Sequence, residues 1–161
     1  MKNIYTEFQA NFIKHAEDAK RLLYGEFTYK DEDYKYFTED GIVVYIVPKS
    51  MWWINDTRAA QKGGEASKST SESILTQMKQ CIPVRKIGTE VNAKKELIVL
   101  ESYDKSLKLY ADPKKFKEFD KPDFYIEAYN PKGAMFVYWK GNPCAILYPV
   151  LPVKTTEEDP S

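Results

Sequence analysis

The chain has 161 residues, of which 43% are hydrophobic, 14% aromatic and 30% charged. This is the composition of a folded domain, because disordered chains contain fewer apolar residues, and about 150 residues suffice to bury a core without a metal or disulfide. The 24 basic residues balance 24 acidic ones, which excludes binding to nucleic acid or anionic membrane through net charge alone. We predict one α+β domain over residues 1–153, followed by a disordered acidic tail over 154–161.

The cysteines and the N-terminus bear on where the protein works. Cys81 and Cys144 are far apart in sequence and belong to no C-x-x-C pair. The N-terminal residues lack the apolar segment of a secretory signal, and no apolar run approaches the roughly 20 residues of a membrane helix. We therefore expect a cytoplasmic protein that makes no membrane contact and whose cysteines are buried free thiols.

The N-terminal third is expected to form a helix followed by strands. Thr6 and Gln9 match a capping box, and apolar residues then recur at three- and four-residue spacing, which predicts a helix that ends before Gly25. Residues 26–37 alternate between apolar and polar types, as in strands. The run Ile42–Val47 is apolar at every position and is typical of a central strand.

A polar stretch over about residues 55–73 contains two adjacent glycines and little to bury, so it predicts a flexible loop. Ser69 and Glu72 form a second capping box at its end. The helix that they begin is expected to be short, because Pro83 stops it.

The second half of the chain is mostly strand. Asp112 and Pro113 pair a helix N-cap with proline at the first helical position, and Phe116 and Phe119 anchor the short helix that follows. Strands are predicted on either side of this helix, at 84–91, 96–102, 107–111, 124–129, 134–139 and 144–148. The whole pattern favours one or more antiparallel sheets, with two main helices and the short third one on one face.

Catalytic and metal-binding patterns are missing from the sequence. His15 is the one histidine, which argues against catalytic triads and histidine-based metal sites. Neither glycine-rich phosphate-binding loop is present. The acidic run Asp31–Asp33 lacks the ligand spacing of a calcium loop and is interpreted as a hairpin tip. We expect no catalytic residue, no cofactor and no metal.

Trp52 and Trp53 are the first candidate binding residues. Neighbouring residues on a strand point to opposite faces, so one ring can be buried while the other is exposed. An exposed tryptophan suits a protein contact or a stacking platform for a base. Burial of both rings under the following loop is the alternative.

Lys114, Lys115 and Lys117 are the second candidate, because they are clustered around Phe116 on the short helix. Such a cluster is usually a solvated helix face, particularly with Glu118 and Asp120 beside it. Contact with the phosphates of nucleic acid is the functional alternative.

The C-terminal run over residues 107–152 resembles the last stretch of a bacterial sliding clamp domain. There a strand leads into a short helix, and three strands close the domain in an apolar ending with a Pro-Val pair. The matching positions are Leu109, Tyr110, Asp112, Pro113, Phe116, Phe119, Met135–Val137 and Ile146–Val150. The resemblance implies a DNA-clamp-like fold; the length of one domain and the zero net charge leave ring formation open.

These observations favour a non-enzymatic binding protein with a clamp-like domain, encoded by a phage or mobile element and linked to DNA metabolism. The alternative is a protein-only interaction module or inhibitor of a host factor that uses the Trp52–Trp53 region. A small enzyme built from scattered tyrosines, lysines and carboxylates is a third hypothesis. The partner is a protein or a nucleic acid, and a homodimer remains open.

Overall fold

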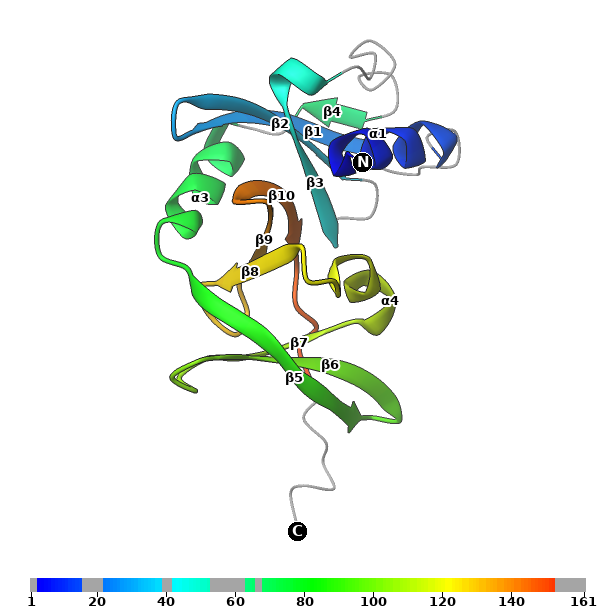
Figure 1. Cartoon of the computed structure of the whole chain (residues 1–161), viewed down its shortest axis with the longest axis vertical. Coiled ribbons are helices and arrows are strands. Elements are labelled where there is room, and N and C mark those ends of the chain that lie inside the picture. Colours follow the sequence, from blue (N-terminus) through cyan, green and yellow to red (C-terminus); the bar gives the residue numbers. More distant parts are fainter. Residues whose placement is uncertain (1–2, 16–21, 39–41, 53–62, 66–67, 153–161) are drawn as a thin grey trace.

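The computed structural model describes residues 3–15, 22–38, 42–52, 63–65 and 68–152 (Figure 1). The side chains of His15 and Trp53 and the acidic tail lie outside what it describes. The helical elements are α1 (Ile4–His15), η1 (Lys49–Met51), α3 (Lys68–Met78), α4 (Pro113–Phe116) and η2 (Lys117–Phe119). The strands are β1 (Leu22–Tyr29), β2 (Glu32–Thr38), β3 (Val43–Pro48), β4 (Gly63–Glu65), β5 (Ile82–Asn92), β6 (Lys95–Ser102), β7 (Lys108–Ala111), β8 (Phe124–Ala128), β9 (Met135–Trp139) and β10 (Asn142–Leu147).

The strands form one sheet in the order β4-β1-β2-β3-β10-β9-β8-β5-β6-β7 (Figure 1). Every neighbouring pair is antiparallel except β1 with β4. The predicted α+β class and its antiparallel sheet are therefore confirmed. The β1–β2 turn places Lys30 and Asp31 at positive φ, so the acidic run that follows is at a hairpin tip, as predicted.

The sheet is covered on both faces, because β3 is apolar on both. Val43, Tyr45 and Val47 point to the face that packs against α1 and α4. Val44 and Ile46 point to the other face, where α3 packs. The expectation that all helices lie on one face is wrong, since a central strand that is apolar at every position needs cover on both sides.

The first helix begins before Thr6, where the capping box predicted its start. It also ends at His15, before the predicted end near Gly25. The side chain of Asn3 accepts hydrogen bonds from the backbone N–H groups of Tyr5 (2.9 Å) and Thr6 (3.4 Å). Asn3 is therefore the residue that caps α1. At the other end, Leu22 already belongs to β1, so the helix does not continue to Gly25.

The predicted loop over 55–73 is wrong in two places. Gly63–Glu65 forms β4 alongside β1, and α3 begins at Lys68. The remainder of that loop lies outside the described residues. Ile74 and Met78 of α3 are buried against the sheet.

Both cysteines are free thiols, as predicted. Cys144 is fully buried on β10, and its burial raises the pKa of the thiol. Cys81 is half-buried and donates to the carbonyl oxygen of Gln77 (3.1 Å). Burial also raises the pKa of Cys81, to about 12. Burial therefore disfavours the reactive thiolate form of both cysteines.

Two helix-and-strand units have the same order along the chain. Helix α1 precedes β1, β2 and β3, whereas α4 and η2 precede β8, β9 and β10. The two sets of strands meet at the β3–β10 pair. From this pair outward the strands follow as β3, β2 and β1 on one side and as β10, β9 and β8 on the other. On the face that α1 and α4 share, the rings of Phe8 and Phe119 lie 6.3 Å apart between centroids.

The chain after β10 crosses to the far edge of the sheet (Figure 1). The N–H of Tyr148 donates to the carbonyl oxygen of Ile42 (2.9 Å), and the N–H of Val150 donates to that of Tyr110 (2.8 Å). These bonds tie β3 to β7 through the C-terminal segment. They also cover part of the outer edge of β7, which would otherwise present unpaired backbone groups.

Candidate functional site

The most distinctive surface feature is a cleft where β5 separates from β8. The two strands pair only from Ile82 to Val84, opposite Ile126 to Ala128. Beyond Val84, β5 continues with β6 and leaves the edge of β8. The opening has a volume of about 380 Å³, and we call it the β5–β8 cleft.

The floor of the β5–β8 cleft is apolar. It is made by Val84, Ile126 and two rings of the α4–η2 segment, Phe116 and Phe119. All four side chains are buried in the core. Phe119 also packs edge-on against Phe124, with centroids 5.5 Å apart. Buried side chains of this kind are closely packed.

Two tyrosines border the cleft, Tyr103 and Tyr125. Tyr103 is 65% exposed, and the guanidinium of Arg85 lies 4.7 Å from its ring centroid. Tyr125 is 46% exposed and donates a hydrogen bond to a carboxylate oxygen of Glu127 (2.7 Å). Partial burial and this bond raise the pKa of Tyr125, so its hydroxyl remains protonated and neutral.

The turn that carries Tyr103 is fixed by Asp104. One oxygen of this carboxylate accepts from the hydroxyls of Ser102 (2.7 Å) and Ser106 (2.6 Å) and from the N–H of Ser106 (3.0 Å). These hydrogen bonds lower the pKa of Asp104 to about 2. The carboxylate is therefore ionised at neutral pH and already engaged within its own turn.

The charged residues that line the cleft are Arg85, Lys86, Lys121 and Asp120. Lys86 pairs with Asp120 (Nζ–Oδ2 2.8 Å), an exposed pair of the kind worth less than about 1 kcal/mol. Neither Arg85 nor Lys121 has an ion-pair partner in the described part of the chain. The lining therefore carries an excess of positive charge.

The predicted lysines belong to the same helical segment. Lys114 and Lys117 are exposed and Lys115 is half-buried. None of the three lines the β5–β8 cleft. Their predicted role as phosphate contacts therefore stays a prediction.

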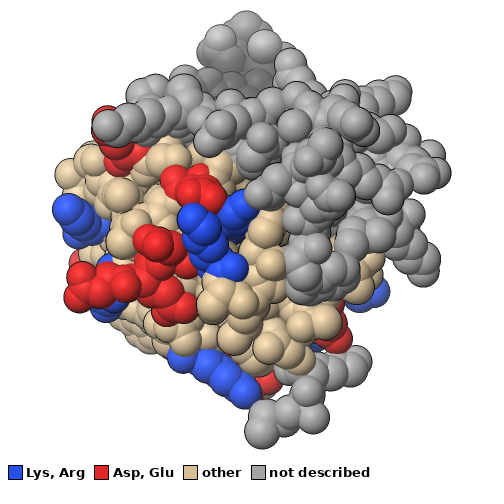
Figure 2. All heavy atoms as spheres, turned by 90° about the horizontal axis from the view of Figure 1, so that it is seen from above, with Lys and Arg blue, Asp and Glu red and all other residues tan. Residues whose placement is uncertain are grey.

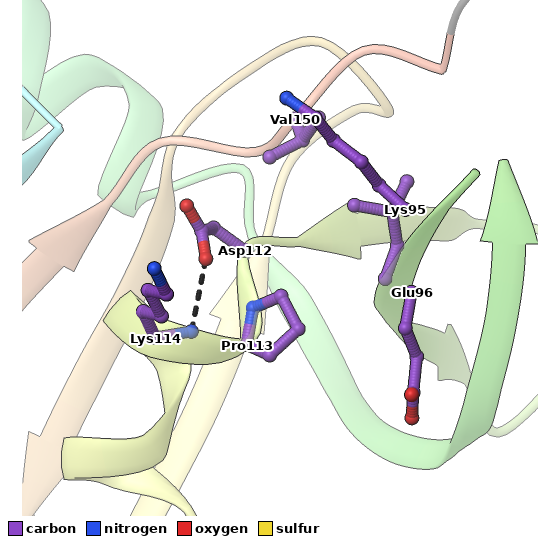
Figure 3. Close-up of a pocket in the computed structure, with 7 residues that line it drawn as sticks. Lys95, Glu96, Asp112, Pro113, Lys114 and Val150 are labelled. Carbon is purple, nitrogen blue, oxygen red and sulfur yellow. Dashed lines mark hydrogen bonds between the residues drawn. The ribbon is translucent and has the colours of Figure 1, made fainter. Parts of the chain in front are cut away.

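Lys114 lines a second hollow, of about 450 Å³, at the start of α4 (Figure 3). Its lining also contains Lys95, Glu96 and Asp112, so its charges cancel. The dashed bond in Figure 3 is the one that the side chain of Asp112 accepts from the N–H of Lys114 (2.9 Å), which caps the helix. The Asp112–Pro113 helix start is confirmed. This hollow is larger than the β5–β8 cleft, yet its capping carboxylate serves the fold and it presents no exposed ring.

Trp52 is half-buried against the core and does not stand free as a platform. Its ring lies 5.6 Å from that of Phe37, and Nζ of Lys35 lies 5.1 Å from its centroid. Trp53 lies outside the described residues. Of the predicted pair, the structure therefore places only Trp52, and it places that ring in packing contacts.

The top of the molecule is electrically mixed. On the described part of the face in Figure 2, Lys and Arg side chains lie next to Asp and Glu. The same intermixing is found at Glu26, whose carboxylate contacts Lys35 (3.5 Å) and Lys49 (3.6 Å). Neighbouring opposite charges cancel at a distance, so this face does not attract a polyanion.

Comparison with known proteins finds no matching family, no matching curated protein and no matching solved structure. Among the residues that the structure describes, no three His, Cys, Asp or Glu side chains are grouped so that they could hold a metal ion. No helix in the same residues has both the length and the apolar character to cross a membrane.

Sequence reasoning missed the residues that border the cleft, above all Arg85, Tyr103 and Tyr125. They come from β5, the β6–β7 turn and β8, and no spacing along the chain brings them together. One signal was present. Arg85 and Lys86 are adjacent in a predicted strand, and two consecutive cations cannot both face a core, so β5 had to leave the sheet interior there.

Glu118 shows how the α4–η2 segment docks on the sheet. Its carboxylate accepts a hydrogen bond from the hydroxyl of Tyr45 on β3 (2.7 Å). Burial raises the pKa of Glu118, and the bond from Tyr45 and the nearby charge of Lys121 only partly oppose this effect. At neutral pH the fold thus holds a carboxylate that would be better solvated in the unfolded chain.

We predict that Glu118→Gln makes the protein more stable at pH 7. A raised pKa means that the folded state binds the proton more tightly, so stability is highest below the ordinary value of 4.5 and falls as the pH rises through the folded pKa. Glutamine keeps an acceptor for Tyr45 and removes this fall. Thermal unfolding between pH 4.5 and 7 measures it, with the exposed Glu72→Gln as control. A wild-type stability that did not fall more steeply than that of the variant would refute the assignment.

Proposed function

We propose that this chain is a non-enzymatic binding protein with a clamp-like domain, linked to DNA metabolism, that contacts nucleic acid through the β5–β8 cleft. The observation that carries the proposal is the pair of cations without ion-pair partners, Arg85 and Lys121, beside two exposed tyrosines. Arginine and lysine are the usual partners of phosphate groups, and aromatic rings beside them are the usual partners of bases.

The small charge excess limits the affinity. Most of the free energy of nonspecific nucleic-acid binding comes from counterions released when cations contact phosphates. With Arg85, Lys86 and Lys121 as contacts, the logarithm of the affinity for a single strand should fall with the logarithm of the salt concentration with a slope of about −2. We therefore expect binding that is measurable at low salt and weak at high salt.

The repeated helix-and-strand units support the clamp-like part of the proposal. The α1 and α4 units each place a helix on one common face and three antiparallel strands in the sheet. A clamp-type domain of two such halves is what the resemblance of residues 107–152 implies. Fold alone does not fix a function, so the nucleic-acid contact is argued from the cleft.

Fluorescence anisotropy with a labelled 12-nucleotide single strand and the corresponding duplex, at 50 and 200 mM salt, tests the proposal. The double variant Arg85→Ala, Lys121→Ala should weaken binding and reduce the steepness of the salt dependence, because it removes two phosphate contacts. The control is Lys79→Ala, Lys132→Ala, which makes the same change of charge at two exposed positions outside the cleft lining.

Two results would contradict the proposal. The first is an absence of binding to either nucleic acid at 50 mM salt. The second is an equal loss in the double variant and its control, which would reduce the interaction to general charge. Salt-insensitive capture of a purified protein in place of nucleic acid would favour the protein-only interaction module instead.

A further inference from the structure

We propose that the β5–β8 cleft receives an unpaired base of single-stranded nucleic acid, which stacks on Tyr103 or Tyr125 while Arg85 and Lys121 contact the flanking phosphates. The inference rests on the proposed function and adds to it a preference for unpaired strands. It is argued from the exposure of the two rings, the shape of the cleft and the positions of its charges.

Both tyrosines are exposed, and the ring of Tyr125 also packs against that of buried Tyr138, with centroids 5.7 Å apart. Tyr103 is 65% exposed and Tyr125 is 46% exposed, and neither belongs to the buried clusters that hold the sheet and helices together. Any base can stack on such a ring, because every base has a π-face. Arg85 adds a planar guanidinium over Tyr103, and guanidinium planes stack on bases as well.

The shape of the cleft selects against a duplex. The opening lies where β5 leaves β8, and buried apolar side chains line it together with Arg85, Lys86 and Lys121. A base within a duplex is paired and stacked, so it reaches such a floor only after it has been unstacked, which costs a few kcal/mol. An unpaired base avoids most of that cost. The volume of about 380 Å³ lies in the range of ligand sites.

Three carboxylates near the two tyrosines are already engaged. Asp120 pairs with Lys86, Asp104 accepts from its two serines, and Glu127 accepts from Tyr125. Arg85 and Lys121, in contrast, form no ion pair among the described residues, and Lys121 acts on the Glu118 carboxyl only through its nearby charge. The charges that remain for a ligand are positive, which complements phosphate.

The test compares three labelled 12-mers at 50 mM salt: single-stranded dT, its duplex with dA, and a 12-mer of abasic sites that keeps the phosphates and lacks the bases. We expect the dT strand to bind at least about fivefold more tightly than the other two, because each stacked base adds that much or more. Tyr103→Ala or Tyr125→Ala should remove most of this advantage and leave the affinity for the abasic strand unchanged.

Two further variants sharpen the test. Tyr129→Ala removes a tyrosine that is 44% exposed and outside the cleft lining, so it should bind like the wild type. Tyr125→Phe loses the hydrogen bond to Glu127 but keeps the ring, and it should restore the preference for the dT strand that Tyr125→Ala loses. Circular dichroism confirms that each variant is folded.

The outcomes separate the two proposals. Equal, salt-dependent binding of all three 12-mers that Arg85→Ala, Lys121→Ala still weakens would overturn the stacked base and leave the proposed function standing. No binding of any 12-mer would overturn both. Binding of a 12-residue poly-glutamate peptide as tight as that of the dT strand would also overturn the inference, because the cleft would then recognise negative charge without bases.

Discussion

Phe8→Ala should lower the free energy of unfolding by about 3–5 kcal/mol. Phe8 is 2% exposed and lies in the core together with Ile4 and Tyr5 of the same helix. Its ring lies 4.6 Å from that of Tyr45 on β3 and 6.3 Å from that of Phe119 on η2. The substitution leaves a cavity between the two helices of the shared face, and close-packed surroundings fill such a cavity only in part.

Urea unfolding monitored by circular dichroism measures this loss. Thr6→Ala, on the exposed side of the same helix, is the control and should cost well under 1 kcal/mol. A loss below about 1 kcal/mol for Phe8→Ala would mean that α1 does not pack on this face of the sheet. The description of a core face covered by α1, and the correspondence between the two helix-and-strand units, would then both be wrong.

Gly25→Ala should destabilise the protein by about 1–3 kcal/mol through overpacking. Tyr36 is the partner of Gly25 on the neighbouring strand β2, and its ring lies against Gly25. A Cβ atom at this position would overlap Oη and Cζ of Tyr36. Tyr36 cannot move aside easily, because it is fully buried and its hydroxyl forms a hydrogen bond with Ser71 Oγ on α3 (3.0 Å). The substitution therefore forces either β1 or α3 to shift.

Gly88→Ala is a matched control for this prediction. It makes the same exchange on a strand at a position where an added Cβ meets no atom within 4 Å. Its effect should stay within about 0.5 kcal/mol. Combining Gly25→Ala with Tyr36→Phe should cost less than the sum of the two single changes, because the phenylalanine lacks the overlapping hydroxyl. Equal melting temperatures for the two glycine variants would refute the packing of Tyr36 over Gly25.

The strands and turns could be predicted from sequence because their signals are local. Alternating apolar residues marked β1 and β2, and the Asp112–Pro113 pair marked the start of α4. The short strand β4 could not be predicted in this way. Its glycines carry no alternating pattern, and it exists only because β1 offers an edge with which it pairs.

The faces of the sheet and the binding cleft could not be predicted because they depend on tertiary packing. The pattern of Ile42–Val47 showed that β3 is buried on both sides without showing which helix covers which side. The tryptophan pair attracted a functional interpretation because the rings are large, yet Trp52 packs against Phe37. Tyr103 and Arg85 looked ordinary in sequence, and only the separation of β5 from β8 brings them to one opening.

Ultraviolet cross-linking of the protein to the dT 12-mer, followed by mass spectrometry of the digested complex, tests the central claim most directly. If the β5–β8 cleft holds an unpaired base, the cross-linked peptides should contain Tyr103 or Tyr125, and Arg85→Ala combined with Lys121→Ala should reduce their yield. Cross-links confined to peptides outside the cleft, or a yield that the double variant does not change, would contradict it.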